Sequence, residues 1–159
     1  MPPAPNLPAN YSQLLAPLFE VLPLSQAMPQ LVVTQPGPTD LVESLVRSPL
    51  ITARPTLAAG LWLYVDQLDR SHTISQAIES PTGAFWHGIM HRREGDFWNS
   101  HYWFRQVGKH PAMKMIEDYD AHRFIDEAAS AHAKGQAPAS LLDMQRREWM
   151  MLFAWCANA

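Results

Sequence analysis

The second part of the chain, from residue 55 onward, is built from long apolar runs that no strong helix breaker interrupts. Examples are TLAAGLWLYVDQLD, FWNSHYWFRQV and LLDMQRREWMMLFAWCA, and glycine or proline separates each run from the next. Convincing alternation of apolar and polar residues, which is typical of strands, does not appear, although LVVT at 31–34 could be extended. The pattern therefore predicts an all-α protein, a compact helical bundle.

Most of the predicted helices are delimited by residues that favour the start or the end of a helix. Pro55 suits a first helical position, Asp96 an N-cap and Gly95, Gly108 and Gly135 the residue after a helix end. The predicted helices begin at Pro55, at Ser71 with SHTISQAI, after Ser80-Pro81 with FWHGIMHRRE, after Asp96, after Pro111 with the long run 112–134, and at Ser140, where Asp143 completes a capping-box pattern. LVESLVR, within residues 40–47, predicts one further short helix.

The first 54 residues have a different composition from the rest. Eleven of the 14 prolines lie in residues 1–60, and only five charged residues do. Residues 1–9 predict a flexible tail, and the prolines of 10–54 exclude long elements there. This segment is still rich in Leu, Val and Ile, so we expect it to wrap onto the helical core, residues 55–159, within one domain, residues 1–159.

Composition and charge exclude several classes of protein. The net charge of −3 argues against a dedicated nucleic-acid binder. No window of about 18 apolar residues predicts a membrane span, and the start of the chain lacks the pattern of a secretory signal. The single cysteine, Cys156, cannot form an internal disulfide, which fits a reducing, cytoplasmic location.

Histidines and carboxylates recur at helical spacing in the middle of the chain. His87, His91 and Glu94 share one helix face, and Asp69 and His72 are three residues apart on the preceding segment. If the two segments pack antiparallel, we expect His72, His87 and His91 to ligate a metal, with Glu94 or Asp69 as a fourth ligand or general base. Imidazole nitrogen suits Zn or Fe, and carboxylate oxygen extends the choice to Mn. The pattern predicts a metal-dependent enzyme, a hydrolase or an oxygen-using enzyme acting on a small molecule.

Aromatic and basic residues surround this cluster and predict a small aromatic-walled pocket. Trp86, Arg92, His101 and His110 are the candidates for substrate binding. A second interpretation stays open, in which the histidines form a structural polar network bonded to the carboxylates. The protein would then be a non-enzymatic interaction module or a homodimer, joined through the C-terminal helix, which is apolar nearly all round from Trp149 to Cys156.

The block 84–111 resembles a single tetratricopeptide-type helical hairpin. Gly88 falls on its small-residue position, Gly95-Asp96-Phe97 on its turn, and Ser100 and Phe104 on the small and large positions of the second helix. Alanine at 84 replaces the family's tryptophan, and no second copy follows at the period of about 34 residues. The resemblance implies a tight antiparallel hairpin with the histidines pointing inward.

The longer run PTGAFWHGIMHRREGDFWNSHYWFRQVGKHP is similar to a block in small uncharacterised proteins of bacteria and fungi. That resemblance covers roughly residues 55–111 of this chain and implies no activity.

Overall fold

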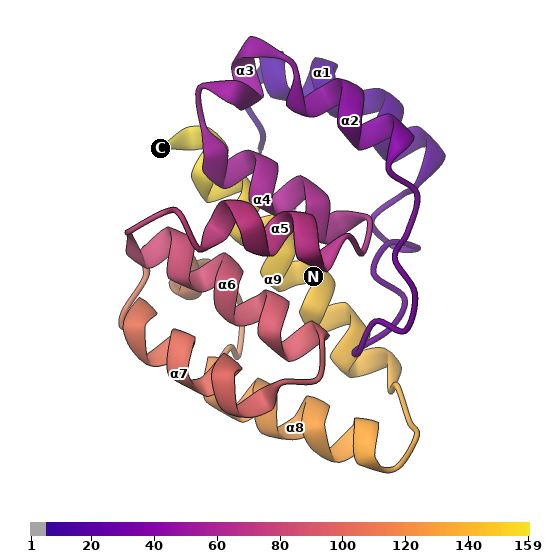
Figure 1. Ribbon diagram of the computed structural model, residues 1–159, viewed down its shortest axis with the longest axis vertical. Helices are drawn as coiled ribbons and strands as arrows, with labels where there is room; N and C mark the ends of the chain where they lie inside the picture. Colours follow the sequence, from indigo (N-terminus) through magenta and orange to yellow (C-terminus); the bar gives the residue numbers. More distant parts are fainter. Residues whose placement is uncertain (1–5) are drawn as a thin grey trace.

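Helices supply all the regular secondary structure in the computed structural model, which describes residues 6–159. The elements are α1 (Ala9–Val21), α2 (Asp40–Val46), α3 (Pro49–Thr52), α4 (Pro55–Tyr64), α5 (Leu68–Ser75), α6 (Pro81–Arg93), α7 (Phe97–Val107), the 3-10 helix η1 (Pro111–Met115), α8 (Ala121–Ala133) and α9 (Ala139–Asn158) (Figure 1). The all-α prediction is confirmed for this part of the chain. The first five residues of the predicted tail lie outside the described residues, and Ala9 already begins α1.

Helix α9 forms the centre of the core. Its C-terminal half buries Trp149, Leu152, Phe153 and Cys156, as the all-round apolar pattern of this helix suggests. The indole N–H of Trp149 donates to the carbonyl oxygen of Gly60 on α4 at 2.7 Å. A Cβ at Gly60 would lie 2.7 Å from the Trp86 ring of α6, so only glycine lets α4, α6 and α9 approach this closely.

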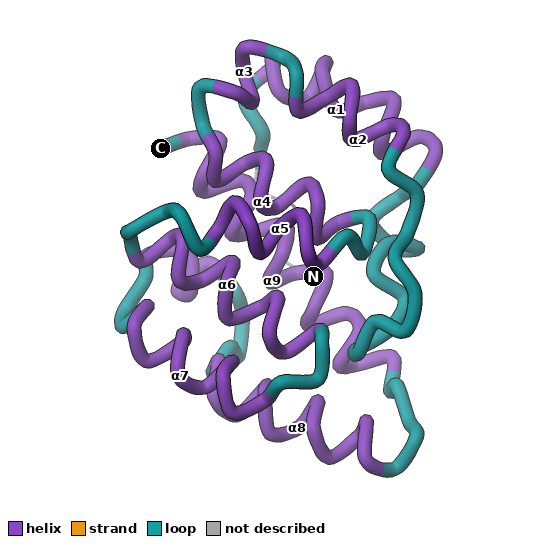
Figure 2. Tube along the Cα trace, in the orientation of Figure 1, coloured by secondary structure: helices purple, strands orange, loops and turns teal. Residues whose placement is uncertain are grey.

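The N-terminal segment wraps around this core, as its apolar content predicts. Figure 2 shows the long loop between α1 and α2 running along one side of the molecule. Side chains of α9 hold the loop by its backbone: Gln145 donates to the carbonyls of Met28 and Gln30, and Arg146 donates to that of Ala27. The segment LVVT forms bends rather than a strand, and Val33 donates to the carbonyl of Arg93 at 2.8 Å.

The prediction that prolines exclude long elements from this segment is wrong at α1, which runs for 13 residues with Pro17 inside it. Tyr11, Leu15 and Leu18 are buried at i, i+4 and i+7, while Pro17 is exposed. Burial of this apolar stripe outweighs the hydrogen bond that Pro17 cannot donate. The short helix predicted at 40–47 is confirmed as α2.

Two long runs predicted to be helical are interrupted, and the helix predicted to begin at Ser71 already begins at Leu68. The chain leaves α4 at Tyr64, and Asp66 adopts a φ of 61° before α5 begins. Arg93 explains this break, because it donates to the Leu63 carbonyl at 3.1 Å and to the Asp66 carboxylate at 2.6 Å. The run 112–134 divides into η1 and α8.

Local capping explains how α8 and α9 begin. The Asp120 carboxylate accepts from the Arg123 backbone N–H and so starts α8, just after Asp118 turns with a φ of 55°. The capping box predicted at Ser140 does not form, because α9 begins at Ala139 without a side-chain cap.

Helices α6 and α7 form the tight antiparallel hairpin that the sequence predicts (Figure 1). Ser80 caps α6, and Asp96 caps α7 by accepting from the Asn99 backbone N–H at 3.2 Å. The two helices touch where the small residues lie: the Ser100 hydroxyl donates to the Gly88 carbonyl at 2.7 Å, and a Cβ at Gly88 would lie 2.8 Å from the Phe104 ring. This close contact fixes which residues of α7 face the histidines of α6.

Candidate metal centre

Three histidines from two helices come together where α5 packs against α6. His72 comes from α5, and His87 and His91 lie one turn apart on α6. One nitrogen from each ring lies within 4.8 Å of the other two. Two nitrogens on one zinc ion lie no more than about 4.2 Å apart, so small side-chain rotations would bring these three onto one ion. The structure therefore brings together the three histidines that were predicted as metal ligands.

His87 is the most deeply placed of the three imidazoles. Its side chain belongs to a residue that is only 3% exposed, and its Nδ1 has no hydrogen-bond partner among residues 6–159. Burial, together with the neighbouring His91 and His72, lowers the pKa of His87 to about 3. His87 is thus neutral at pH 7 and keeps a lone pair, which is the form that binds a metal.

Glu94 orients His91, as a carboxylate next to a metal-ligating imidazole does. Nδ1 of His91 lies 2.6 Å from Oε1 of Glu94, and because a carboxylate accepts, the ring donates through Nδ1. The lone pair of His91 is then on Nε2. Such carboxylate–histidine pairs fix the tautomer of metal ligands and raise their basicity.

A second set of three groups, His91, Glu94 and Asp96, also lies within 4.8 Å of one another. Both carboxylate oxygens of Asp96 already accept hydrogen bonds from Asn99, one from its backbone and one from its side chain. Asp96 thus serves as the cap of α7. Asp69, predicted as a general base, is exposed on α5 and belongs to neither set of three.

Trp103 of α7 is a member of this site that sequence reasoning missed. Its ring stacks on the imidazole of His87, with 3.8 Å between the centroids and 16° between the planes. His72 meets the same imidazole edge-on, at 4.7 Å. A signal for Trp103 was present in the hairpin, because residues 87 and 103 are each eight positions from Gly95 at its turn.

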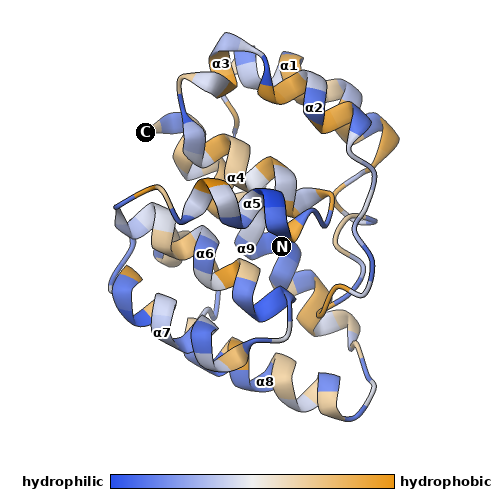
Figure 3. Cartoon of the chain, in the orientation of Figure 1, coloured by the Kyte–Doolittle hydropathy of each residue, from blue (hydrophilic) through white to orange (hydrophobic). Residues whose placement is uncertain are grey.

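Two of the candidates for substrate binding lie in the core instead. Arg92 has no exposed surface, and its two terminal nitrogens donate to the two oxygens of Glu148 at 3.0 and 2.7 Å. The hydroxyl of Tyr119 donates to the same carboxylate at 2.5 Å. Trp86 is also fully buried. Figure 3 shows that the C-terminal end of α6 is hydrophilic, and its residues Arg92 and Arg93 are both fully buried.

The other two candidates form separate contacts. His110 is buried; its Nδ1 accepts from the Ala112 backbone N–H, so its Nε2 donates to the Thr82 hydroxyl at 2.9 Å. His101 lies on the α8 side of α7, with Nδ1 2.7 Å from Nδ1 of His122 and Nε2 2.9 Å from Asp126. Neither residue joins the three histidines.

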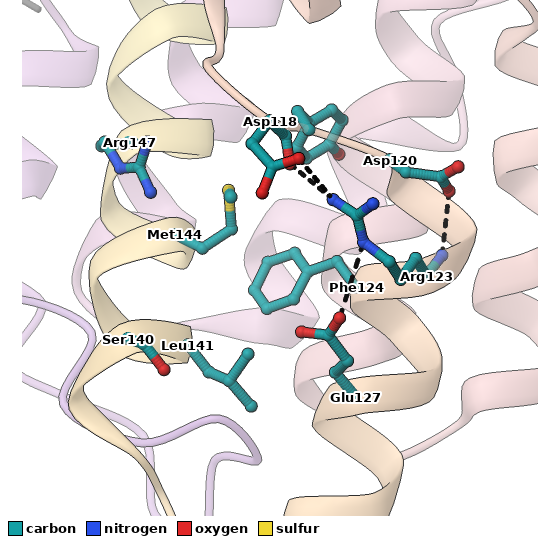
Figure 4. Close-up of a pocket in the computed structure, with 10 residues that line it drawn as sticks. Asp118, Asp120, Arg123, Phe124, Glu127, Ser140, Leu141, Met144 and Arg147 are labelled. Carbon is teal, nitrogen blue, oxygen red and sulfur yellow. Dashed lines mark hydrogen bonds and ion pairs between the residues drawn. The ribbon is translucent and has the colours of Figure 1, made fainter.

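A cavity of about 220 Å³ lies between α8 and α9, far along the chain from the histidines. Figure 4 shows Arg123 in it, bonded to Asp118 and Glu127, with the apolar side chains of Phe124, Leu141 and Met144 to one side. Arg123 is thus already engaged by acidic neighbours, and the cavity holds no imidazole or thiol to bind a transition metal.

No family model, curated protein or solved structure matches the chain. The two resemblances stated from the sequence therefore remain predictions. Within the described residues, no helix has both the length and the apolar character that crossing a membrane requires.

Proposed function

We propose that the protein binds one divalent transition-metal ion through His72, His87 and His91 and uses it as a metal-dependent enzyme on a small molecule. The observation that carries the proposal is the convergence of three imidazole nitrogens within 4.8 Å, one of which belongs to the buried, neutral His87. Buried polar atoms are nearly always hydrogen-bonded, so the unpartnered Nδ1 of His87 is an exception that a ligand would explain.

The donor set fits zinc best, with iron and manganese as alternatives. Three neutral imidazoles leave a fourth position open in a tetrahedral site, as catalytic zinc sites do. When bound, zinc would act as a Lewis acid and lower the pKa of a coordinated water to about 7, which is the chemistry of a hydrolase. Glu94 holds the ring of His91 in the ligating tautomer, and Trp103 keeps water from one face of His87.

Metal analysis of protein purified without a His-tag tests this proposal. We expect close to one equivalent of zinc, iron or manganese in the wild type, and less than about a tenth of an equivalent in His87→Ala and His91→Ala. Cobalt titration of metal-free protein adds a spectroscopic readout of tetrahedral geometry. His132→Ala is the matched control, because His132 is exposed on α8 and belongs to neither set of potential ligands.

A structural polar network is the second candidate for the histidine cluster, in a protein that acts as an interaction module or a homodimer. The bond between His91 and Glu94 and the stacking of Trp103 on His87 favour it, because both already hold the rings in place. A wild type that binds less than about a tenth of an equivalent of metal, with cobalt uptake unchanged in both variants, would establish this alternative. Light scattering would then test the dimer.

A further inference from the structure

A cavity of about 440 Å³ lies next to the histidine cluster, between the end of α5, the start of α6 and α7. Gln76, four residues after His72, and Ala84, three residues before His87, line it, so it lies one helical turn from the cluster on both helices. The three histidines themselves do not line it. Its volume is in the range of sites that bind small molecules.

Two aromatic rings form a corner in this cavity. Tyr102 and Trp103 both line it, and their planes are perpendicular with centroids 5.4 Å apart. Trp103 stacks closely on His87, and Tyr102 lies parallel to the exposed Trp98, with 6.3 Å between the centroids and 10° between the planes. The stacking on His87 thus orients Trp103 before any ligand arrives, which reduces the entropy that binding must overcome.

The charge of the cavity has one sign. Glu79 is its single charged lining residue, and the other polar groups are hydroxyls and amides from residues such as Gln76 and Gln106. No lysine or arginine lines it. An anionic ligand would therefore meet repulsion without compensation, whereas a cation would be attracted by the Glu79 carboxylate and by the aromatic surface that His87 leaves uncovered.

We propose that this cavity binds a small alkylated ammonium compound, with the cationic group in the corner of Tyr102 and Trp103 and its charge facing Glu79. Perpendicular aromatic rings surrounding a cation are the usual means of recognising quaternary ammonium groups. The proposal does not depend on the metal centre, because none of its lining residues is a proposed ligand.

Calorimetric titration of metal-free protein with choline tests the site, and neutral 3,3-dimethylbutan-1-ol is the matched probe because it has the same shape without the charge. We expect choline to bind at least about tenfold more tightly, since the cation–π contacts and the carboxylate act only on the charged compound. Glucose is a third probe, because a site for neutral sugars would bind glucose more tightly than choline.

Variants locate the binding. Glu79→Gln and Tyr102→Leu should each weaken choline binding about fivefold or more, whereas Tyr102→Phe keeps the ring and should stay close to the wild type. Glu20→Gln removes the same charge from exposed α1 and should change nothing. Near-ultraviolet circular dichroism confirms that each variant is folded.

Three results would overturn the proposal: equal binding of choline and its neutral isostere, preference for glucose, or choline binding that Glu79→Gln and Tyr102→Leu leave unchanged. Absence of choline binding at tens of millimolar would do so too.

Discussion

Neighbouring residues of α6, His91 and Arg92, belong to two polar clusters, one partly and one fully buried, that differ in what they offer a ligand. Arg92 is neutralised by Glu148, whose carboxylate also accepts from Tyr119. A guanidinium has only donors, and the lone pairs facing it are already used. Around His91 the imidazoles face each other and present lone pairs without a cation. Burial of polar groups alone therefore does not point to a ligand, whereas the unpartnered Nδ1 of His87 among three converging imidazoles supports the metal site that we propose.

The largest effect that this comparison predicts is on stability, at the arginine cluster. Glu148→Ala leaves the Arg92 guanidinium buried without a counter-charge, so we expect the free energy of unfolding to fall by about 3–5 kcal/mol. Urea denaturation followed by tryptophan fluorescence measures the change. Glu148→Gln keeps the shape and serves as the milder variant if Glu148→Ala does not fold. Unchanged stability in both variants would contradict the role we assign to this ion pair.

The next effect concerns metal and belongs to the histidine cluster alone. If zinc binds the proposed site, zinc at about 100 times its Kd should raise the free energy of unfolding of the wild type by about 2.7 kcal/mol, because a ligand that binds only the folded state stabilises that state. His91→Ala should show no such increase, and Glu94→Gln should weaken zinc binding about 10–100-fold. Denaturant titrations with zinc and with a chelator give both numbers. Equal stabilisation of wild type and His91→Ala would place the zinc elsewhere.

A pH dependence of stability follows from the buried histidines. Burial lowers the pKa of His87 to about 3 and also lowers the pKa of His110. Between about pH 6.5 and the folded-state pKa values, the unfolded chain binds protons that the folded chain does not, so stability falls with acidification. For His87 the loss from pH 7 to pH 5 is up to about 2 kcal/mol in metal-free protein.

His110→Gln and His87→Leu should each flatten this dependence, and His132→Ala should not. Denaturation series at several pH values measure the slopes. A slope that neither variant changes would show that other groups cause the acid sensitivity.

The parts of the site that were predictable from the sequence follow local rules. The hairpin was predictable because Ser80, Gly95 and Asp96 act on residues next to them in the sequence. The shared helix face of His87 and His91 was predictable from their spacing. The approach of His72 was expected on the condition that the two segments pack antiparallel. The predictions that were wrong concern residues whose partners lie far away in the sequence.

Arg93 donates a hydrogen bond to Asp66, 27 residues earlier, where the helix is interrupted. No local sequence pattern predicts this contact. Glu148 is 56 residues from Arg92, so Arg92 was predicted to bind substrate rather than to pair with a carboxylate in the core. At Pro17 the opposite error occurred: tertiary burial of Leu15 and Leu18 outweighed a local rule.

The smallest predicted effect separates the two clusters most directly. His87→Leu removes a buried nitrogen that has no partner and fills a similar volume, so metal-free protein should lose no stability at pH 7 and should gain up to about 1–2 kcal/mol. A comparable apolar replacement at one side of the arginine pair, Glu148→Leu, should be strongly destabilising. Urea denaturation in a chelator compares them. If His87→Leu instead lowers stability as Glu148→Leu does, the histidines form a satisfied structural network, and the argument for a ligand from the unpartnered Nδ1 of His87 is lost.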